Sequence, residues 1–476
     1  MFVLHRLHLG PGDRGQRARR LPAFTLLALA TAAVTGGTAV PLPARAQQPL
    51  VEHPNILLIV TDDQRTGTLD VMPATTWYFK RWGTRYANAF ATSPLCCPSR
   101  ASIMTGQYPH NHGVTQNEQA DRLIQETTLQ YYLQQNGYLT GIAGKYLNGW
   151  KEAASAPPYF DRWATIEDAN YRKVYFDFLA NVNGEIRFPR GYSTDFVARK
   201  TVRFMRQFEA EDETPWFLYV APFASHKPFD PERRYRNAAT PQWFGNPSVT
   251  EGDRTDKPPW VQERNVRLPG SQAVARLQLR TLMSADDLVE SVFKSMSRLD
   301  EKRDTLAIFI SDNGYLWGEH GLASKRFPYT GAIKVPLMMR WPGVVPADTI
   351  DERLVANIDV APTIYQTIGI LPDHAVDGRS LLADEPREKL LVEYFGSRLG
   401  GDVPAWASMR SPTYQYVEYY EDQGPTTLFA EYYDLVNDPF QLENLLEDGD
   451  PTNDPQAAIL SVELARTRDC EGESCP

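Results

Sequence analysis

The chain has 476 residues, of which 42% are hydrophobic and 11% aromatic. A chain of this length and composition can bury a large core, so we exclude global disorder and expect one large or two moderate folded domains. The formal net charge of −10 argues against broad nucleic-acid binding.

The first 46 residues differ from the rest of the chain. Several arginines precede an apolar, alanine-rich run from Leu21 to about Val40, and Ala44-Arg45-Ala46 follows it. This order is typical of a secretory signal peptide cleaved after Ala46, and glycines and prolines break the run before it reaches a comfortable bilayer span. We therefore expect a secreted or cell-envelope protein with no stable membrane insertion. The pair Arg19-Arg20 is compatible with twin-arginine (Tat) export, so both the Sec and the Tat route stay open.

Cleavage of this segment makes the protein more acidic. It removes six Arg and one Asp, which leaves 43 basic and 58 acidic residues and a formal charge of −15. Such a charge excludes nucleic acid as a partner and slows capture of a long polyanion unless a local basic rim surrounds the site.

Three continuous apolar runs have the pattern of strands buried on both faces of a parallel sheet. They cover residues 55–60, 216–220 and 306–310. Helical periodicity alternates with these strands and predicts an α/β sheet. The predicted helices cover residues 194–208, 274–299 and 357–368.

Polar residues follow the end of each predicted strand. Asp62 and Asp63 follow the first, His226 lies shortly after the second, and Asp312 and Asn313 follow the third. Because ligands collect beyond the carboxyl ends of strands in such sheets, we expect these side chains to converge there.

The last quarter of the chain has a different character, and we divide the mature protein into a catalytic domain at 47–370 and a C-terminal subdomain at 371–476. Tyrosine-rich runs at 414–419 and, more weakly, at 431–435 alternate like strands and predict a small antiparallel sheet. Cys470 and Cys475 lie in a short polar tail, where an exported protein favours a disulfide loop. Residues 233–268 lack periodicity and are rich in Pro, Arg and Asn, so we expect a long loop over the site.

Cys96 and Cys97 need another explanation, because adjacent cysteines bridge only with strain and no other cysteine remains to partner them. Pro98 suits the first turn of a helix and Gly106 its end, which places Cys96 just before a helix N-terminus, where an anion is stabilised. A buried structural thiol is the general alternative for any cysteine.

The run Cys96-Cys97-Pro98-Ser99-Arg100, continued by Thr105-Gly106-Gln107-Tyr108-Pro109, resembles the C-x-P-S-R signature of type I sulfatases. The resemblance implies an alkaline-phosphatase-like fold, with a large, mostly parallel mixed sheet flanked by helices. It also implies that a formylglycine-generating enzyme oxidises Cys96 to formylglycine, that Cys97 is the variable position, and that Arg100 holds the modified side chain. A hydrated aldehyde has two geminal hydroxyls, one to attack sulfur and one to expel the covalent sulfate.

The resemblance assigns Asp62, Asp63, Asp312 and Asn313, together with residue 96, to one metal ion. Their oxygen atoms are the ligands that hard cations prefer, so we expect calcium, with magnesium as the alternative. Asp-Asp after a strand is often a helix cap and Asp-Asn-Gly often a turn, so each pair alone would be weak evidence.

Three further residues match sulfate-binding positions of the family, namely Lys145, His226 and Lys325. Two lysines can neutralise sulfate oxygens, and the imidazole can protonate the leaving alcohol. Many family members carry a histidine two residues after the motif lysine, whereas this chain has Leu147. His110 and His112 are the candidates for that missing role.

The motif variants, such as Gly144-Lys145-Tyr146-Leu147-Asn148, are similar to N-acetylglucosamine-6-sulfatases and heparan-acting extracellular sulfatases. They imply a sulfate-ester small molecule or glycan as substrate, with a sulfated amino sugar or an aryl sulfate as the expected type. Two alternatives stay open: a phosphonate or phosphate ester hydrolase of the same fold, and a non-catalytic glycan-binding homologue in which Cys96 remains a thiol.

Overall fold

The structure is a computed structural model that describes residues 53–150, 155–166, 173–211, 214–396, 403–421, 424 and 426–476. The predicted signal peptide at 1–46 lies outside the described residues. Among the helices that are described, none combines the length and the apolar character needed to span a membrane.

The protein is built on a ten-stranded sheet with the strand order β10-β2-β9-β8-β1-β7-β3-β4-β5-β6. The strands are β1 Asn55–Thr61, β2 Gly83–Phe90, β3 Leu139–Gly144, β4 Arg162–Ile166, β5 Ala180–Val182, β6 Glu185–Arg187, β7 Trp216–Ala221, β8 Thr305–Ser311, β9 Leu337–Arg340 and β10 Thr349–Ala356. The adjacent strands β8, β1, β7, β3 and β4 are parallel, whereas β9 is antiparallel to both of its neighbours. The large, mixed and mostly parallel sheet predicted from the sequence is therefore confirmed.

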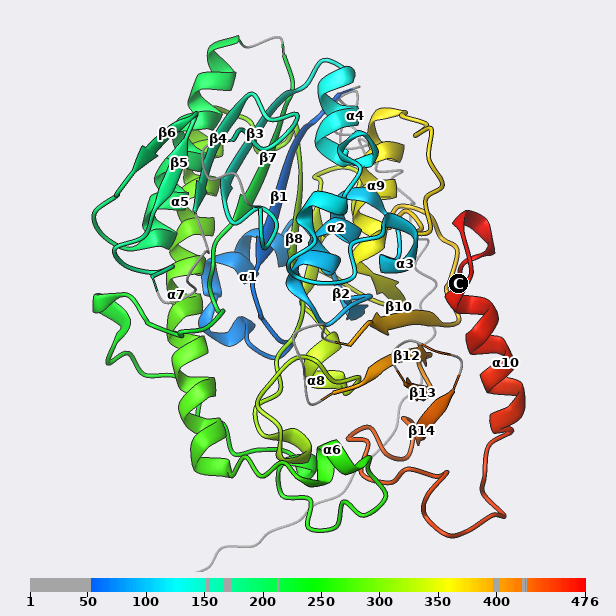
Figure 1. Cartoon of the computed structure of the whole chain (residues 1–476). Helices are drawn as coiled ribbons and strands as arrows, with labels where there is room; N and C mark the ends of the chain where they lie inside the picture. The colour runs from blue at the N-terminus through cyan, green and yellow to red at the C-terminus, as the bar shows by residue number, and fades with distance from the viewer. Residues whose placement is uncertain are drawn as a thin grey trace, which may run out of the picture. The chain divides into compact units, whose positions relative to one another are not determined.

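Helices cover both faces of this sheet (Figure 1). They are α1 Pro73–Lys80, α2 Cys96–Thr105, α3 Pro109–His112, α4 Leu129–Gln135, α5 Ser193–Phe208, α6 Pro259–Gln262, α7 Leu268–Arg298, α8 Thr330–Ile333, α9 Val360–Ile368 and α10 Ala457–Arg468. Short 3-10 helices lie at Leu69–Val71, Ala120–Arg122, Gln125–Thr127, Glu209–Glu211, Arg233–Tyr235, Pro247–Val249, Glu319–Gly321, Asn357–Asp359 and Gly472–Ser474.

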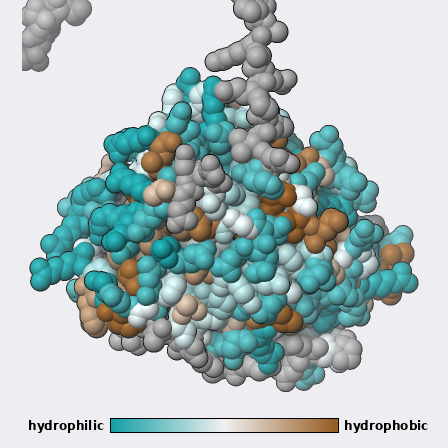
Figure 2. Space-filling view, turned by 90° about the horizontal axis from the view of Figure 1, so that it is seen from above, coloured by the Kyte–Doolittle hydropathy of each residue, from teal (hydrophilic) through white to brown (hydrophobic). Residues whose placement is uncertain are grey.

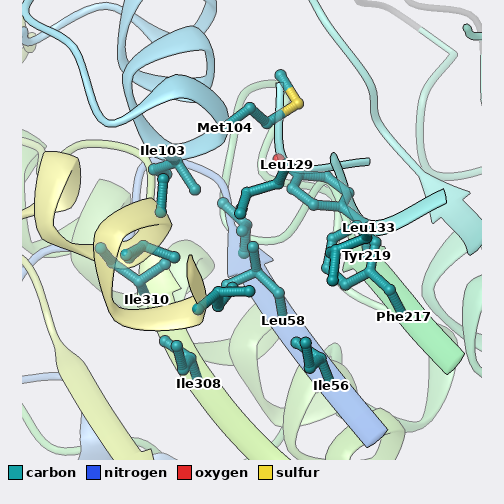
Figure 3. Close-up of a cluster of buried hydrophobic side chains, with 14 of the residues drawn as sticks. Ile56, Leu58, Ile103, Met104, Leu129, Leu133, Phe217, Tyr219, Ile308 and Ile310 are labelled. Atoms are coloured by element: carbon teal, nitrogen blue, oxygen red, sulfur yellow. The ribbon is translucent and has the colours of Figure 1, made fainter. Parts of the chain in front are cut away.

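The central strand β1 shows how one apolar run serves two cores. Side chains of a strand alternate between its faces, so Ile56 and Leu58 join one buried cluster, while Leu57 and Ile59 join another. Figure 3 shows the first cluster, in which β1, β7 and β8 pack against residues of α2 and α4. All ten residues of α2 are buried, so the helix that begins at Cys96 is fixed against the sheet.

The long helix α7 begins six residues before the predicted start at 274. Its first buried positions are small or polar, namely Ser271, Ala275 and Gln278, so the apolar spacing that marks a helix is weak there. Pro269 at the start of α7 also fits a helix N-terminus. The segment 233–268 contains only short helical pieces, and its Trp243 and Arg254 contact residues 317 and 320.

The C-terminal part forms the predicted small antiparallel sheet, with the order β11-β12-β13-β14. Its strands are β11 Leu390–Tyr394, β12 Ala405–Arg410, β13 Tyr414–Tyr420 and β14 Thr427–Asp434. Cys470 and Cys475 form a disulfide. The surface in Figure 2 is mostly hydrophilic, with hydrophobic residues scattered in small groups.

Candidate active site

Four parallel strands deliver polar side chains to one edge of the large sheet. Asp62 and Asp63 follow β1, Lys145 follows β3, Ser225 and His226 lie after β7, and Asp312 and Asn313 follow β8. Helix α2 presents Cys96 from its first residue, rather than from just before the helix as expected. The structure thus brings together the residues whose convergence the strand pattern predicted.

Arg100 lies at the centre of this cluster and is completely buried. Its Nε donates to Asp312 Oδ2 at 2.8 Å, and its Nη2 lies 3.7 Å from Asp62 Oδ2. A buried guanidinium without acidic partners would be very costly, so the two carboxylates make its burial possible. Nη2 donates no hydrogen bond to any described residue, which leaves one buried donor for a further anionic group.

Two lysines add to the positive charge around Cys96. Lys145 Nζ donates to Asp62 Oδ2 at 2.6 Å, and Lys325 Nζ contacts both Asp63 Oδ1 and, at 2.6 Å, Cys96 Sγ. Burial alone would raise the pKa of Asp62, but the charges of Lys145 and its cationic neighbours hold that pKa well below its usual range. Asp62 therefore carries its negative charge near neutral pH.

Cys96 is completely buried within this charged cluster. Its Sγ lies 3.4 Å from Asp62 Oδ1. Burial and the charge of Asp62 raise the pKa of the thiol well above its ordinary value, despite the opposing effect of Lys145 and Lys325. A raised pKa disfavours the thiolate, which is the nucleophilic form of cysteine.

The donor set fits a hard divalent cation. Ligand atoms of Asp62, Asp63, Cys96 and His226 all lie within 4.8 Å of one another, and Asn313 lies beside them because its Nδ2 donates to Asp63 Oδ1 at 2.7 Å. Because nitrogen and oxygen of an amide are assigned from hydrogen bonding, a flip would turn the Asn313 oxygen toward an ion. Carboxylate and amide oxygens match calcium or magnesium.

Asp312 contacts the backbone of two of these residues. Its Oδ1 accepts from the backbone N–H groups of Asp63 and Asn313, at 3.1 and 2.8 Å. Three carboxylates and three cations, from Asp62, Asp63, Asp312, Arg100, Lys145 and Lys325, give the cluster no net formal charge. A bound divalent cation would therefore leave it positive, which suits an anionic substrate.

His226 is oriented by the backbone carbonyl of the next residue. Its Nδ1 lies 2.7 Å from Lys227 O and donates to it, so Nε2 faces the cluster at 3.9 Å from Asp63 Oδ2. Tyr175 Oη donates to His226 O at 2.7 Å and holds the loop.

Several supporting residues were not predicted from the sequence. Gln278 Nε2 donates to Ser225 O at 3.1 Å, which ties α7 to the loop that carries His226. Ser99 Oγ donates to Asp312 O and Asn357 Nδ2 donates to Ser99 Oγ at 2.9 Å. A polar residue on the buried face of an apolar helix was the available signal for Gln278.

His110 and His112 do not take the place of the missing family histidine. His112 Nδ1 accepts from Val114 N at 3.1 Å and its Nε2 contacts Ser102 Oγ at 3.0 Å. Both nitrogens of His110 are also engaged, by Glu393 and by Cys470 O. Both rings therefore serve the packing of α2 and the C-terminal tail, and neither contacts Cys96.

The chain is similar to known proteins over most of its length. The sulfatase family model matches residues 54–370, and a model described as N-sulphoglucosamine sulphohydrolase, C-terminal, matches residues 318–469. The chain is 31% identical to human N-acetylglucosamine-6-sulfatase over 487 aligned residues, covering 89% of this chain and 86% of that protein. It is 32% identical to a putative extracellular sulfatase Sulf-1 homolog of Caenorhabditis elegans, covering 69% of this chain and 48% of that protein. The chain thus spans about half the length of that relative. It spans 31% of the length of the Drosophila melanogaster extracellular sulfatase SULF-1 homolog.

Solved structures share the fold at lower identity. One, described as a complex with its substrate D-glucosamine-2-N,6-O-disulfate, superposes with a TM-score of 0.76 at 20% identity, covering 88% of this chain and 97% of that chain. A phosphonate monoester hydrolase of Agrobacterium radiobacter superposes with a TM-score of 0.68 at 19% identity, covering 88% and 96%.

The sheet order and these superpositions define an alkaline-phosphatase-like fold. Within that class, the chain belongs to the sulfatase family, whose named members are sulfuric ester hydrolases.

Proposed function

We propose that this protein hydrolyses sulfate esters with a formylglycine formed from Cys96 and a divalent cation, calcium by preference. One observation carries the proposal: three buried carboxylates and three buried or nearly buried cations surround a buried residue 96. This arrangement disfavours thiolate chemistry and favours a side chain that brings its own hydroxyl groups.

Asp62, Asp63, Asp312 and Asn313 are the proposed protein ligands of the cation, beside residue 96. The cation would supply Lewis-acid stabilisation of negative charge and lower the pKa of a nearby hydroxyl. Formylglycine, once hydrated, would supply the attacking hydroxyl and the second hydroxyl that releases sulfate.

The cations of the chain bind and orient the substrate. Lys145 and Lys325 flank Cys96 and neutralise the sulfate oxygens, while the free Nη2 of Arg100 donates to an oxygen on residue 96. Donors that are already fixed in a buried site need not reorient as charge develops in the transition state, so no free energy is spent on reorganisation.

His226 protonates the leaving alcohol. Its Nδ1 proton is committed to Lys227 O, so Nε2 is the atom that carries the transferable proton. Replacing His226 with alanine should lower kcat about 10²- to 10⁴-fold for a sugar sulfate, whose alkoxide needs a proton to leave. The loss should be much smaller for nitrophenyl sulfate, whose leaving group is already stable as an anion. Equal losses on both substrates would contradict the role of His226 as general acid.

The proposed substrate is a sulfated amino sugar, and relatives named N-acetylglucosamine-6-sulfatase support this choice. We also retain residues 1–46 as an export signal, 47–370 as the catalytic domain and 371–476 as the C-terminal subdomain. Activity then depends on a formylglycine-generating enzyme in the producing cell.

The reaction is tested by parallel assays with nitrophenyl sulfate, nitrophenyl phosphate and a phosphonate monoester. Among these three esters, we expect the highest kcat/KM for nitrophenyl sulfate. An amino-sugar 6-sulfate, assayed in addition, should give a higher kcat/KM than nitrophenyl sulfate. A preference for the phosphonate or phosphate ester would assign the protein to the other chemistry that this fold supports. No turnover of any ester by protein with modified Cys96 would indicate a binding protein.

A further inference from the structure

A basic surface lies on α5, away from the active site. Two neighbouring pockets of about 270 and 470 Å³ open there, one toward the β5–β6 hairpin and one toward α7, and both are lined by Arg203 and Gln207. The N-terminal end of α5 is the end nearer the active site, because Ser193 N donates to Tyr175 O and Tyr175 Oη donates to His226 O.

Five cations line the two pockets, and we call them the α5 basic surface: Arg187, Arg199, Lys200, Arg203 and Arg206. Only one carboxylate, that of Glu185, lines either pocket, and it pairs with Arg187. The side chains of Arg199, Arg203 and Arg206 are exposed. They form no ion pair within the described part of the chain. Burial, Arg203 and the other neighbouring arginines lower the pKa of Lys200, as expected where cations crowd without a counter-charge.

This crowding is unusual for a chain with a formal charge of −10. A solvated helix face that serves solubility alone usually mixes both signs, which gives favourable pairs three or four residues apart. The helix dipole favours a cation in the last turn of α5, which accounts for Arg206 but not for Arg199 or Lys200. Arg199, Lys200 and Arg203 form no ion pair with any described residue, so a bound anion would supply their counter-charge.

We propose that the α5 basic surface is a second binding site, which binds a linear sulfated polysaccharide. This inference extends the proposed sulfatase function and rests on it. Arg199, Arg203 and Arg206 follow the spacing i, i+4, i+7, so they form one stripe about 10 Å long on the helix. Repeated point charges in a row match a polymer with repeated sulfate groups. Polar Asn183, Gln207 and Ser291 line the same pockets and offer hydrogen bonds to sugar hydroxyls.

A second site of this kind would offset the acidity of the protein. The overall charge repels a polyanion, whereas a local basic stripe attracts it. A polymer held at α5 would also keep its other sulfated units at a raised effective concentration near the active site. A small sulfate ester gains nothing from this surface, because it cannot reach both sites.

The test compares two triple variants of the full-length protein that change the net charge equally. The first is Arg199→Glu/Arg203→Glu/Arg206→Glu. The control is Arg85→Glu/Arg122→Glu/Arg466→Glu, which reverses exposed arginines on β2, at the end of the 3-10 helix Ala120–Arg122 and on α10, none of which lines either pocket. Affinity for size-defined dextran sulfate is measured at several salt concentrations, with kcat/KM for nitrophenyl sulfate measured in parallel.

We expect the α5 variant to lose at least about ten-fold in affinity for dextran sulfate. Its salt dependence should also be shallower, because binding through fewer ionic contacts releases fewer counterions. The control should keep nearly wild-type affinity, and both should keep the small-ester activity. An equal loss in both variants, or no loss in either, would overturn the proposal. Binding of the wild-type protein to phosphatidylglycerol vesicles but not to dextran sulfate would also overturn it, since exposed Ile186 and Phe188 lie on the same hairpin.

The two proposals fail separately. If dextran sulfate binding depends on the α5 arginines but no sulfate ester is hydrolysed, the second site stands and the proposed reaction does not. If sulfate esters are hydrolysed while dextran sulfate binding ignores these arginines, only the second site is refuted.

Discussion

Replacing Cys96 with alanine should reduce kcat for sulfate ester hydrolysis by about 10⁴- to 10⁶-fold, the range seen when an enzyme loses its nucleophile. Alanine cannot be converted to formylglycine, and no other described side chain in the cluster can form a hydrated aldehyde. The fold should survive, because the substitution removes a single buried sulfur atom. Steady-state assays and thermal unfolding of the purified variant would measure both effects.

The adjacent cysteine provides a matched control. Cys97 is equally buried, but its Sγ contacts Asn148 O rather than the charged cluster. Cys97→Ala should therefore keep kcat within a few-fold of the wild-type value. Comparable losses in the two variants would mean that the cysteines act through the packing of α2, and would contradict a nucleophilic role for residue 96.

Replacing Asp63 with asparagine should lower calcium affinity by at least about 100-fold, because even outer-shell changes cost 10- to 100-fold. Activity should fall with it and return only in part at high calcium concentration. The side chain of Asp63 has two roles in the cluster, since it pairs with Lys325 and accepts from Asn313 Nδ2 at 2.7 Å. Asparagine keeps an acceptor oxygen but removes the charge that a divalent cation requires.

A buried carboxylate outside the cluster is the control for this experiment. Asp286 accepts hydrogen bonds from Ala74 N and Thr75 N at 3.0 and 2.7 Å, where α7 contacts α1. Asp286→Asn should change stability but not calcium affinity, measured by isothermal titration of protein stripped with a chelator. Unchanged calcium affinity in Asp63→Asn would remove Asp63 from the metal site.

Much of the fold followed from local sequence patterns. The continuous apolar runs that became β1, β7 and β8 are buried on both faces, and strands of that kind belong to parallel sheets. Topology then determined that Asp62, Asp63, Asp312 and Asn313 share one edge, since parallel strands end together. The start of α7 was missed because Ser271 and Gln278, although buried, give no apolar period.

The sequence could not reveal contacts that depend on side chains from distant segments. Arg100 and Asp312 are 212 positions apart, yet they form the buried pair around which the cluster is arranged. The two histidines of α3 were candidates for an active-site role, but His110 instead contacts Glu393 and Cys470, which are far along the chain. No local pattern distinguishes a histidine that anchors a tail from one that serves catalysis.

The most direct test of the account is the chemical identity of residue 96 in active protein. Samples produced with different amounts of formylglycine-generating enzyme are digested, and the peptide that contains Cys96 is weighed by mass spectrometry to obtain the fraction in which oxygen has replaced sulfur with loss of two hydrogens. Specific sulfatase activity should rise in proportion to that fraction and extrapolate to zero for unmodified protein. Full activity in a sample whose residue 96 is entirely a thiol would contradict the account.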